Sequence, residues 1–267
     1  MPSNGANAAV RRCTDECDDK PCAIISDIHS NLAALEAVLA DIDGQGVKHV
    51  CCLGDIVGYG PNPVECWRLL KRICHPIIRG NHDQALSRKG ISRFHPRARK
   101  AIDWTLARLA GEADGLQIAR DLIALPPLFT CRGRLFVHGS PAGATMDYLL
   151  PGDCFDAERM AREFRHVETS AFNGHTHIPG VIEKGGAFIS PEKLNDMTYI
   201  AGQKPAIINV GSVGQPRDGN SKACYVVLDG NAVRYRRVQY DIEKIRRQIL
   251  KLPNLDPFFG DRLLKGQ

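Results

Sequence analysis

The chain has 267 residues, of which 43% are hydrophobic and 24% charged, and its formal net charge at pH 7 is +5. This length and apolar content are enough for one large globular domain with a substantial core. No apolar run approaches the roughly 18 residues of a membrane span, and the net charge is lower than duplex nucleic-acid-binding domains usually carry. We therefore expect no membrane segment and no duplex nucleic-acid partner.

Residues 1–20 are polar, with an arginine pair at 11–12 followed by an acidic stretch where a signal peptide would need an apolar segment. We predict a flexible N-terminal tail over 1–20, a single domain over 21–267 and a cytoplasmic location. None of the ten cysteines forms a CxxC pair, and several lie in apolar patterns, so reduced thiols are expected. The sequence does not indicate an oligomeric state.

From residue 22 onward, short apolar runs alternate with amphipathic stretches, which is typical of an α/β domain. We predict strands at 22–26, at 47–53 and around 77–78, with one helix over 32–42 and another over 63–72. For the second helix, Asn62 is the expected N-cap, Pro63 the first helical residue and Glu65 the acid of a capping box.

The segment from about 84 to 130 differs from its surroundings, because arginine, lysine, alanine and leucine dominate and apolar residues recur at helical spacing. It predicts a helical insertion beside the site. Strands are expected again at 135–139, 171–175, 206–212, 223–229 and 232–238, before a final helix over 242–250. The strand-rich second half favours a second sheet packed on the first.

Side chains that bind metals follow the predicted strand ends in five separate segments. Each segment has an ordinary explanation when taken alone: Asp27 as the cap of the following helix, Asp55 as a turn residue and His138 as a hydrogen-bonded core histidine. Sites in open α/β sheets form outside the carboxyl ends of strands, so five such segments favour a metal site. The candidates are Asp27, His29, Asp55, Asn81, His138, His175 and His177.

These candidates supply carboxylate, amide and imidazole groups but no thiolate. That donor set favours hard or borderline divalent ions such as Mn, Fe, Zn, Co or Ni over a soft metal. Three or four protein ligands hold one catalytic ion and leave it an open position. Seven candidates are therefore too many for one ion and indicate two divalent ions that share a carboxylate.

The order of the motifs resembles that of the calcineurin-like metallophosphoesterases, whose pattern is DxH, GDxxG, GNHD or GNHE, GH and GHxH. The five motifs here are Asp27–His29, Gly54–Gly58, Gly80–Asp83, His138–Gly139 and Gly174–His177, within a match over about 22–230. GDIVGYGPNP and NVGSVGQPRDG are similar to the compact bacterial and archaeal phosphodiesterase branch. The resemblance implies a four-layer α/β/β/α sandwich with two mixed sheets.

The resemblance also implies a division of the ligands between the two ions. It assigns Asp27, His29 and His177 to one ion and Asn81, His138 and His175 to the other, with Asp55 bridging. Two ions about 3.5–4 Å apart would produce a bridging hydroxide that attacks phosphorus. In the same picture His82 assists departure of the leaving oxygen, and Asp83 holds the second nitrogen of its ring.

Two residues outside the ligand set are candidates for substrate binding. Arg217, in GQPRDG, is the expected phosphate-holding residue because a guanidinium matches two phosphoryl oxygens at once. The alternative for Arg217 is a solvated turn arginine. Tyr59, in GYGPNP, either lines the pocket or only packs against its neighbours.

The sequence thus predicts a dinuclear metal-dependent phosphoesterase that acts on a small phosphoester, with a phosphodiester or nucleotide favoured. Phosphomonoesterase or Ser/Thr protein phosphatase-like activity is the first alternative, and the GNHD motif favours it less because the larger protein phosphatases carry GNHE. The alternative from another class is a non-catalytic scaffold of the same fold. Such scaffolds lack the histidine of the GNH motif, which His82 supplies here.

Overall fold

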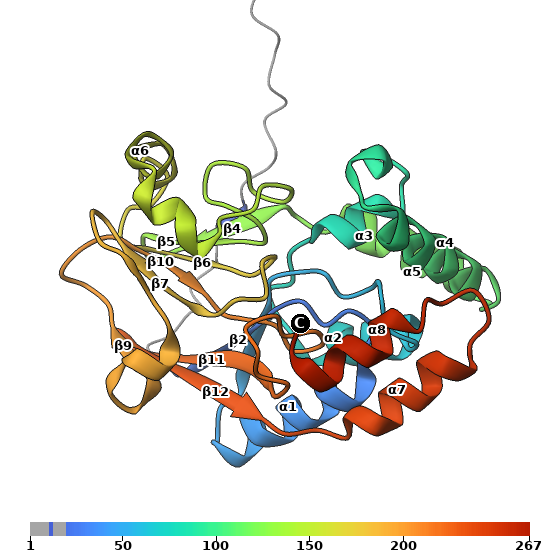
Figure 1. Ribbon diagram of the computed structural model, residues 1–267. Coiled ribbons are helices and arrows are strands. Elements are labelled where there is room, and N and C mark those ends of the chain that lie inside the picture. The colour runs from blue at the N-terminus through green and yellow to red at the C-terminus, as the bar shows by residue number, and fades with distance from the viewer. Residues whose placement is uncertain (1–10, 13–19) are drawn as a thin grey trace, which may run out of the picture.

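Two β-sheets lie face to face at the centre of the computed structural model, which describes residues 11–12 and 20–267 (Figure 1). In this described part, one sheet contains, from edge to edge, β3 (His49–Cys52), β2 (Cys22–Ile25), β11 (Ala223–Asp229), β12 (Ala232–Val238) and β9 (Thr198–Ile200). The other contains β1 (Arg11–Arg12), β4 (Leu128–Cys131), β5 (Arg134–Val137), β6 (Ser170–Asn173), β10 (Ala206–Asn209), β7 (Gly180–Glu183) and β8 (Phe188–Ile189). Both sheets are mixed, since β2 and β3 pair in parallel and β2 and β11 antiparallel, while β5 pairs in parallel with β6 and antiparallel with β4.

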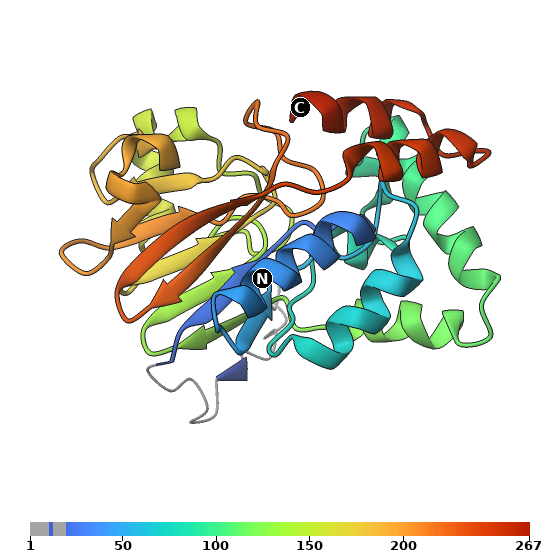
Figure 2. The same ribbon diagram turned by 90° about the horizontal axis from the view of Figure 1, so that it is seen from below.

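Helices cover the outer faces of the two sheets. The helices α1 (Leu32–Gly44), α2 (Pro63–Ile73) and α7 (Ile242–Lys251) pack on the first sheet, and α6 (Ala157–Phe164) packs on the second. At one end of the molecule lie α3 (Asn81–Ala85), α4 (Pro96–Ala110), α5 (Gly115–Ala124) and α8 (Phe258–Asp261), as Figures 1 and 2 show. Short 3-10 helices are η1 (Ile91–Arg93), η2 (Pro151–Phe155), η3 (Pro191–Lys193), η4 (Asn195–Met197) and η5 (Arg262–Lys265).

Three apolar clusters separate the four layers. Successive side chains of a strand point to opposite faces, so Ile24 of β2 packs between the sheets while Ile25 packs toward the helices. On the outer face of the second sheet, Phe164 of α6 packs with Val137 and Ile207. The predicted α/β/β/α sandwich with two mixed sheets is therefore confirmed.

Several predicted elements differ from those observed. The strand expected around 77–78 is reduced to an isolated bridge between Cys52 and Ile77. Helix α2 begins at Pro63 as predicted, but the predicted capping box is not formed. The Asn62 side chain makes no capping hydrogen bond, and the Glu65 carboxylate accepts a hydrogen bond from Arg108 at 3.3 Å. In the predicted insertion over 84–130, the long helices end at Ala124, and the chain then joins the second sheet as β4.

Most of the predicted N-terminal tail lies outside the described residues, although Arg11–Arg12 forms β1 beside β4. Five of the predicted thiols are buried and form no disulfide: Cys51, Cys52, Cys66, Cys74 and Cys224. Within the described part of the chain, no helix combines the length and the apolar character needed to cross a membrane.

Candidate metal centre

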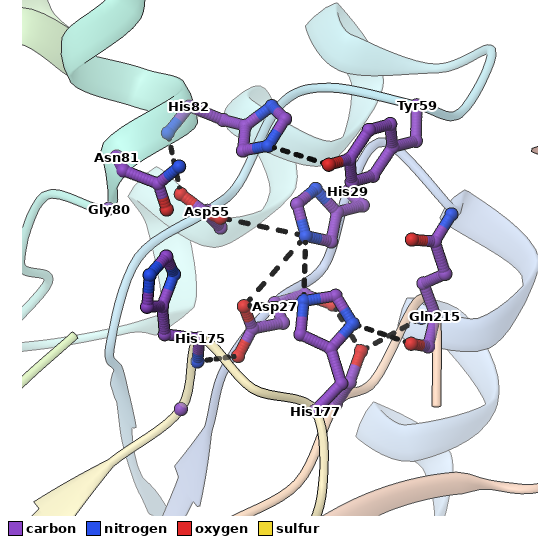
Figure 3. A network of polar contacts seen from close by, with 12 residues as sticks. Asp27, His29, Asp55, Tyr59, Gly80, Asn81, His82, His175, His177 and Gln215 are labelled. Carbon is purple, nitrogen blue, oxygen red and sulfur yellow. Dashed lines mark hydrogen bonds and ion pairs between the residues drawn. The ribbon is translucent and has the colours of Figure 1, made fainter. Parts of the chain in front are cut away.

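Loops that leave the carboxyl ends of β2, β3, β5 and β6 meet the start of α3 and bring the predicted ligands together (Figure 3). Each of the seven side chains has an exposed fraction of 5% or less. Helix α1 is capped by Asn31, whose Oδ1 accepts the Ala34 N–H at 3.1 Å, so Asp27 does not serve as its cap. The capping alternative for Asp27 is therefore wrong.

A first group of donor atoms comes from Asp27, His29 and His177, and Figure 3 shows these side chains directed toward one another. The Nε2 atoms of His29 and His177 are 3.2 Å apart, and Asp27 Oδ1 lies 3.1 Å from Nε2 of His177 and 3.8 Å from Nε2 of His29. Asp27 Oδ1 is buried and accepts no hydrogen bond from the described residues. Lone pairs that converge in this way fit a cation.

A second group lies beside the first and comes from Asn81, His138 and His175. His138 Nε2 is 3.0 Å from Asn81 Oδ1 and 3.2 Å from His175 Nδ1. Asp55 belongs with both groups, because its Oδ2 lies 3.3 Å from Nε2 of His138 and 3.6 Å from Nε2 of His29. One carboxylate oxygen thus stands between two sets of ligand atoms, which is the arrangement that a shared ligand requires.

Main-chain carbonyls fix the orientation of three of the imidazoles. Nδ1 of His29 lies 3.2 Å from the Val57 oxygen, Nδ1 of His138 lies 2.9 Å from the Leu53 oxygen, and Nδ1 of His177 lies 2.5 Å from the Gln215 oxygen. A ring that donates through Nδ1 keeps the lone pair of Nε2 for a metal, and such outer contacts also raise ligand basicity. All three Nε2 atoms face the site.

The backbone of these loops is held in a conformation that non-glycine residues rarely adopt. The φ angle is 54° at Asp27, 46° at His29, 50° at Asp55, 66° at His175 and 61° at His177. Hydrogen bonds between loops hold it, among them Asp27 N–H to Gly54 O at 3.0 Å and His29 N–H to Asp55 O at 2.9 Å. Strained residues of this kind cluster at functional sites.

Glycine is required where the loops approach most closely. A Cβ atom at Gly80 would lie 2.0 Å from Asp55 Oδ1, and one at Gly174 would lie 2.3 Å from Asp27 Oδ2. Either contact would displace a carboxylate of the site. The glycines of the GNHD and GHxH motifs are therefore needed for space.

The electrostatics of the site suit a divalent cation. Burial raises the pKa of the Asp27 and Asp55 carboxyl groups, but the nearby histidines lower it by more. His177 has this effect on Asp27 and His138 has it on Asp55, so both carboxyl pKa values lie below their usual range. Burial lowers the pKa of His175 to about 3 and that of His29 below its usual value. His138 is the exception: burial lowers its pKa, but the Asp55 carboxylate outweighs this and raises it to about 9. Ionised carboxylates beside mostly neutral imidazoles are the donors that borderline divalent ions prefer.

The prediction that Asp83 holds the His82 ring is wrong, because no hydrogen bond joins the two side chains among the described residues. Asp83 instead accepts main-chain N–H groups from Ile56 at 3.0 Å, from Val57 at 3.2 Å and from Gly80 at 2.9 Å. It therefore ties the loop that carries Asp55 to the start of α3. Sequence reasoning missed this role because it depends on donors 26 and 27 residues away along the chain.

Tyr59 holds the His82 ring through a hydrogen bond: its hydroxyl lies 3.1 Å from His82 Nε2, and Figure 3 shows the pair above the ligands. His82 Nδ1 is buried and has no hydrogen-bond partner among the described residues. One ring nitrogen of His82 also lies within 4.8 Å of ligand atoms of His29 and Asp55. His82 is thus placed beside the first donor group and the shared Asp55 carboxylate, with one nitrogen hydrogen-bonded to a hydroxyl.

The outer part of the site combines the predicted Arg217 with residues that the sequence analysis did not identify. Arg217 Nη2 donates to Gln215 Oε1 at 2.9 Å, and Arg262 Nη1 donates to the same oxygen at 3.2 Å. Tyr148 stacks on the ring of His175 with centroids 3.8 Å apart. Gln215 has a sequence signal, since it lies in the GQPRDG segment, whereas Arg262 and Tyr148 lie far from any motif.

Comparison with known proteins finds a family and close relatives. The model of the calcineurin-like phosphoesterase superfamily domain matches residues 21–232. The chain is 37% identical over 254 residues to an uncharacterized protein of Methanocaldococcus jannaschii, with 92% of this chain and 98% of the relative covered. It is similar to the crystal structure of a metallophosphoesterase from Sphaerobacter thermophilus, with 33% identity, a TM-score of 0.78 and coverage of 93% and 99%. A hypothetical protein of Pyrococcus horikoshii, at 20% identity, shares the fold with a TM-score of 0.71 and coverage of 92% and 98%.

Proposed function

The chain belongs to the calcineurin-like phosphoesterase superfamily, and on that premise we propose that it hydrolyses phosphoesters with two divalent metal ions. One observation carries the proposal: Asp55 Oδ2 lies 3.3 Å from a nitrogen of one donor group and 3.6 Å from a nitrogen of the other. A single-ion site would not need a second donor group with its own imidazoles. The buried, convergent lone pairs described above support the same conclusion.

The proposed division of the ligands is the one that the family resemblance implies. Asp27, His29 and His177 would hold one ion, Asn81, His138 and His175 would hold the other, and Asp55 would contribute to both. When bound, the two ions supply an activated water nucleophile at neutral pH and neutralise charge on the phosphoryl oxygens. The donor types accept Mn, Fe, Zn, Co or Ni.

His82 is the proposed catalytic residue at the leaving oxygen. Burial lowers the pKa of His82 to about 4, so the ring is neutral at pH 7 before an anionic substrate arrives. A neutral imidazole still has one N–H, which can donate to the oxygen that departs. Tyr59 positions the ring through its hydroxyl at 3.1 Å from Nε2, the task first predicted for Asp83.

Arg217 is the proposed ligand of a non-bridging phosphoryl oxygen. Its Nε is buried without a hydrogen-bond acceptor among the described residues, and its guanidinium carbon lies 5.9 Å from the centroid of the Tyr59 ring. The guanidinium therefore lies near the residue that positions His82. A planar fork with an unused donor is suited to a phosphoryl group.

A small phosphodiester or nucleotide is the proposed substrate class. Tyr148 is 46% exposed and stacks on His175, which places an accessible aromatic face next to one of the proposed ligands. Such a face suits an aromatic leaving group or a base. A phosphomonoester remains the alternative substrate. The complete ligand set and the presence of His82 favour an enzyme over a scaffold.

Hydrolysis of bis(p-nitrophenyl) phosphate and p-nitrophenyl phosphate tests the proposal. The metal-free chain is loaded separately with Mn, Fe, Zn, Co and Ni, and we expect turnover with at least one ion and none after chelation. Faster cleavage of the diester per enzyme supports the phosphodiesterase assignment, and faster cleavage of the monoester supports the alternative. A chain that binds two ions yet cleaves neither ester with any metal would favour the scaffold.

A further inference from the structure

Two arginines from distant segments meet at one neutral side chain beside the metal centre. Arg217 and Arg262 both donate to Gln215 Oε1, at 2.9 and 3.2 Å. Gln215 is 2% exposed, and its main-chain oxygen lies 2.5 Å from Nδ1 of His177 (Figure 3). The residue that accepts both guanidiniums through its side chain is therefore held through its main chain next to one of the proposed metal ligands.

Within the described residues, this arginine pair lacks the Asp or Glu partners that other arginines have. Arg237, for example, pairs with Asp218 and Glu192, and Arg246 pairs with Asp261 at 2.8 Å. In the described part of the chain, no Asp or Glu side chain forms an ion pair with Arg217 or Arg262. Besides Gln215, Arg262 has one further acceptor, the Gln267 oxygen, to which its Nε donates. Burial, followed by the charge of Arg217, lowers the pKa of Arg262 to about 10. Two partly buried cations held this closely would gain most from an anion that touches both.

The two guanidiniums lie at different depths. Arg217 lies against Tyr59, whose ring is 4.5 Å from that of His29 and whose hydroxyl meets His82. Arg262 instead lies over the ring of Phe258, 5.2 Å from its centroid, and Phe258 is 39% exposed. Arg217 thus belongs to the inner part of the site and Arg262 to its outer edge.

The segment that carries Arg262 is anchored rather than loosely attached. Phe259 of α8 is 3% exposed and packs against Tyr59 with ring centroids 4.8 Å apart. Arg97 of α4 pairs with Asp256 at 3.1 Å and thereby ties the helical insertion to the C-terminal segment. An anchored arginine loses little conformational freedom when it binds an anion.

We propose, resting on the function proposed above, that Arg262 binds a second phosphoryl group of the substrate, next to the one held by Arg217. The site then prefers compounds with two adjacent phosphoryl groups over esters with one. Each guanidinium keeps N–H groups beyond those that bond Gln215 and Gln267, and Gln215 holds the two guanidiniums side by side, so that each can donate to its own phosphoryl group. Arg262 is therefore a specificity-determining residue contributed by the C-terminal segment.

Calorimetric titration of the manganese-loaded full chain tests this directly. The probes are methylphosphonate, with one phosphoryl group, and methylenediphosphonate, with two, both resistant to hydrolysis. We expect the wild-type chain to bind methylenediphosphonate about tenfold or more tightly, the scale of one charge-assisted contact. Arg262→Gln should lose most of that preference and leave the affinity for methylphosphonate unchanged.

Lys265→Gln is the matched control, because Lys265 is exposed on the same 3-10 helix and the substitution removes the same charge. Lys265→Gln should retain the preference for methylenediphosphonate. The same excess of manganese is present in all titrations, so that chelation of the metal by the diphosphonate affects every variant equally. A preference that survives in Arg262→Gln would overturn the proposal. Equal losses for both probes would overturn it as well, because they would place both arginines on one phosphoryl group.

If circular dichroism shows Arg262→Gln to be unfolded, Arg262→Lys takes its place. Lysine keeps the charge but not the fork, so part of the preference should be lost, and full retention would contradict the contact. Competition by inorganic pyrophosphate and by ADP separates two sources of diphosphate: equal inhibition assigns recognition to the diphosphate alone, and stronger inhibition by ADP adds the nucleoside. Because binding needs no turnover, a chain that shows the preference without hydrolysis would refute the proposed function alone.

Discussion

The metal centre and its outer edge are built in different ways. We call the seven proposed ligands the metal floor and the set Tyr59, Tyr148, Gln215, Arg217 and Arg262 the substrate rim. Six of the seven ligands of the floor come from short loops at strand ends, whose backbones hydrogen-bond to one another, and Asn81 is the first residue of α3. The rim combines the GYGPNP and GQPRDG loops with residues from segments far apart in the chain, including η5 at residues 262–265.

This difference separates two kinds of specificity. Under the proposed function, the floor would determine which ions bind and that a phosphoryl group is attacked, so a change there should alter metal content. The rim would contact the parts of the substrate that lie beyond the ions, so a change there should alter kinetics at constant metal content. Measuring metal content and rate for the same variants therefore tests whether the two regions are separate.

Asp55→Asn should have the largest effect. The substitution removes the charge of the one carboxylate that both donor groups share, so occupancy of both ions should fall and hydrolysis should drop to background. Elemental analysis and turnover of bis(p-nitrophenyl) phosphate measure the two quantities. Asp43→Asn, which changes an exposed carboxylate far from the motifs, is the control. Full metal content in Asp55→Asn would contradict a shared ligand.

His82→Ala should have the next largest effect and should leave metal content intact. Loss of a group that assists the leaving oxygen typically costs roughly 10²–10⁴ in rate. The loss should be larger for an alkoxide leaving group than for nitrophenolate, which departs without a hydrogen bond. Measurement of kcat for one good and one poor leaving group decides the matter. Loss of a metal ion in this variant would instead make His82 a ligand and move it into the floor.

Arg217→Ala should reduce kcat/KM at unchanged metal content, because a bidentate contact to the phosphoryl group is lost. We expect a loss of about ten- to a hundredfold, the size of one charge-assisted contact. Arg217→Lys should recover only part of it, since an ammonium lacks the planar fork. Kinetics of the wild-type level in Arg217→Ala would return this residue to the solvated-turn alternative.

Tyr59→Phe should have the smallest effect. It removes one hydrogen bond to the His82 ring, worth about 0.5–1.5 kcal/mol, so the rate should fall by about tenfold at most. As a positioning residue Tyr59 acts through His82, so the loss should again be larger for the poor leaving group. Asp83→Asn provides the contrast: it should lower the melting temperature and affect both leaving groups equally, because Asp83 contacts main-chain N–H groups and not the ring.

The sequence predicted the floor more fully than the rim, for a physical reason. In a motif such as DxH, the short backbone segment after a strand determines where the side chains lie. The motif therefore predicts their positions once the strand before it is identified. The roles of Arg262 and Tyr148 depend on how α8, η5 and the 148–155 segment pack, which no short pattern encodes. Local patterns also failed where a distant partner intervened, as at Glu65, which bonds Arg108 in place of its own helix end.

The same limit applies to the fold. The two longest strands, β11 and β12, were predicted with their observed bounds, whereas the order of the strands within each sheet was not predicted. The short strands β7, β8 and β9 and the helix α6 were not predicted. These elements are short, and tertiary pairing determines them more than local sequence does.

Metal stoichiometry of the wild-type chain tests the central claim most directly. The chain is freed of metal, loaded with excess Mn, passed through a desalting column and analysed for bound metal per chain. Two donor groups that share Asp55 Oδ2 predict two ions per chain, and removal of both should abolish hydrolysis. A saturating value of one ion per chain, with full activity, would contradict the dinuclear centre.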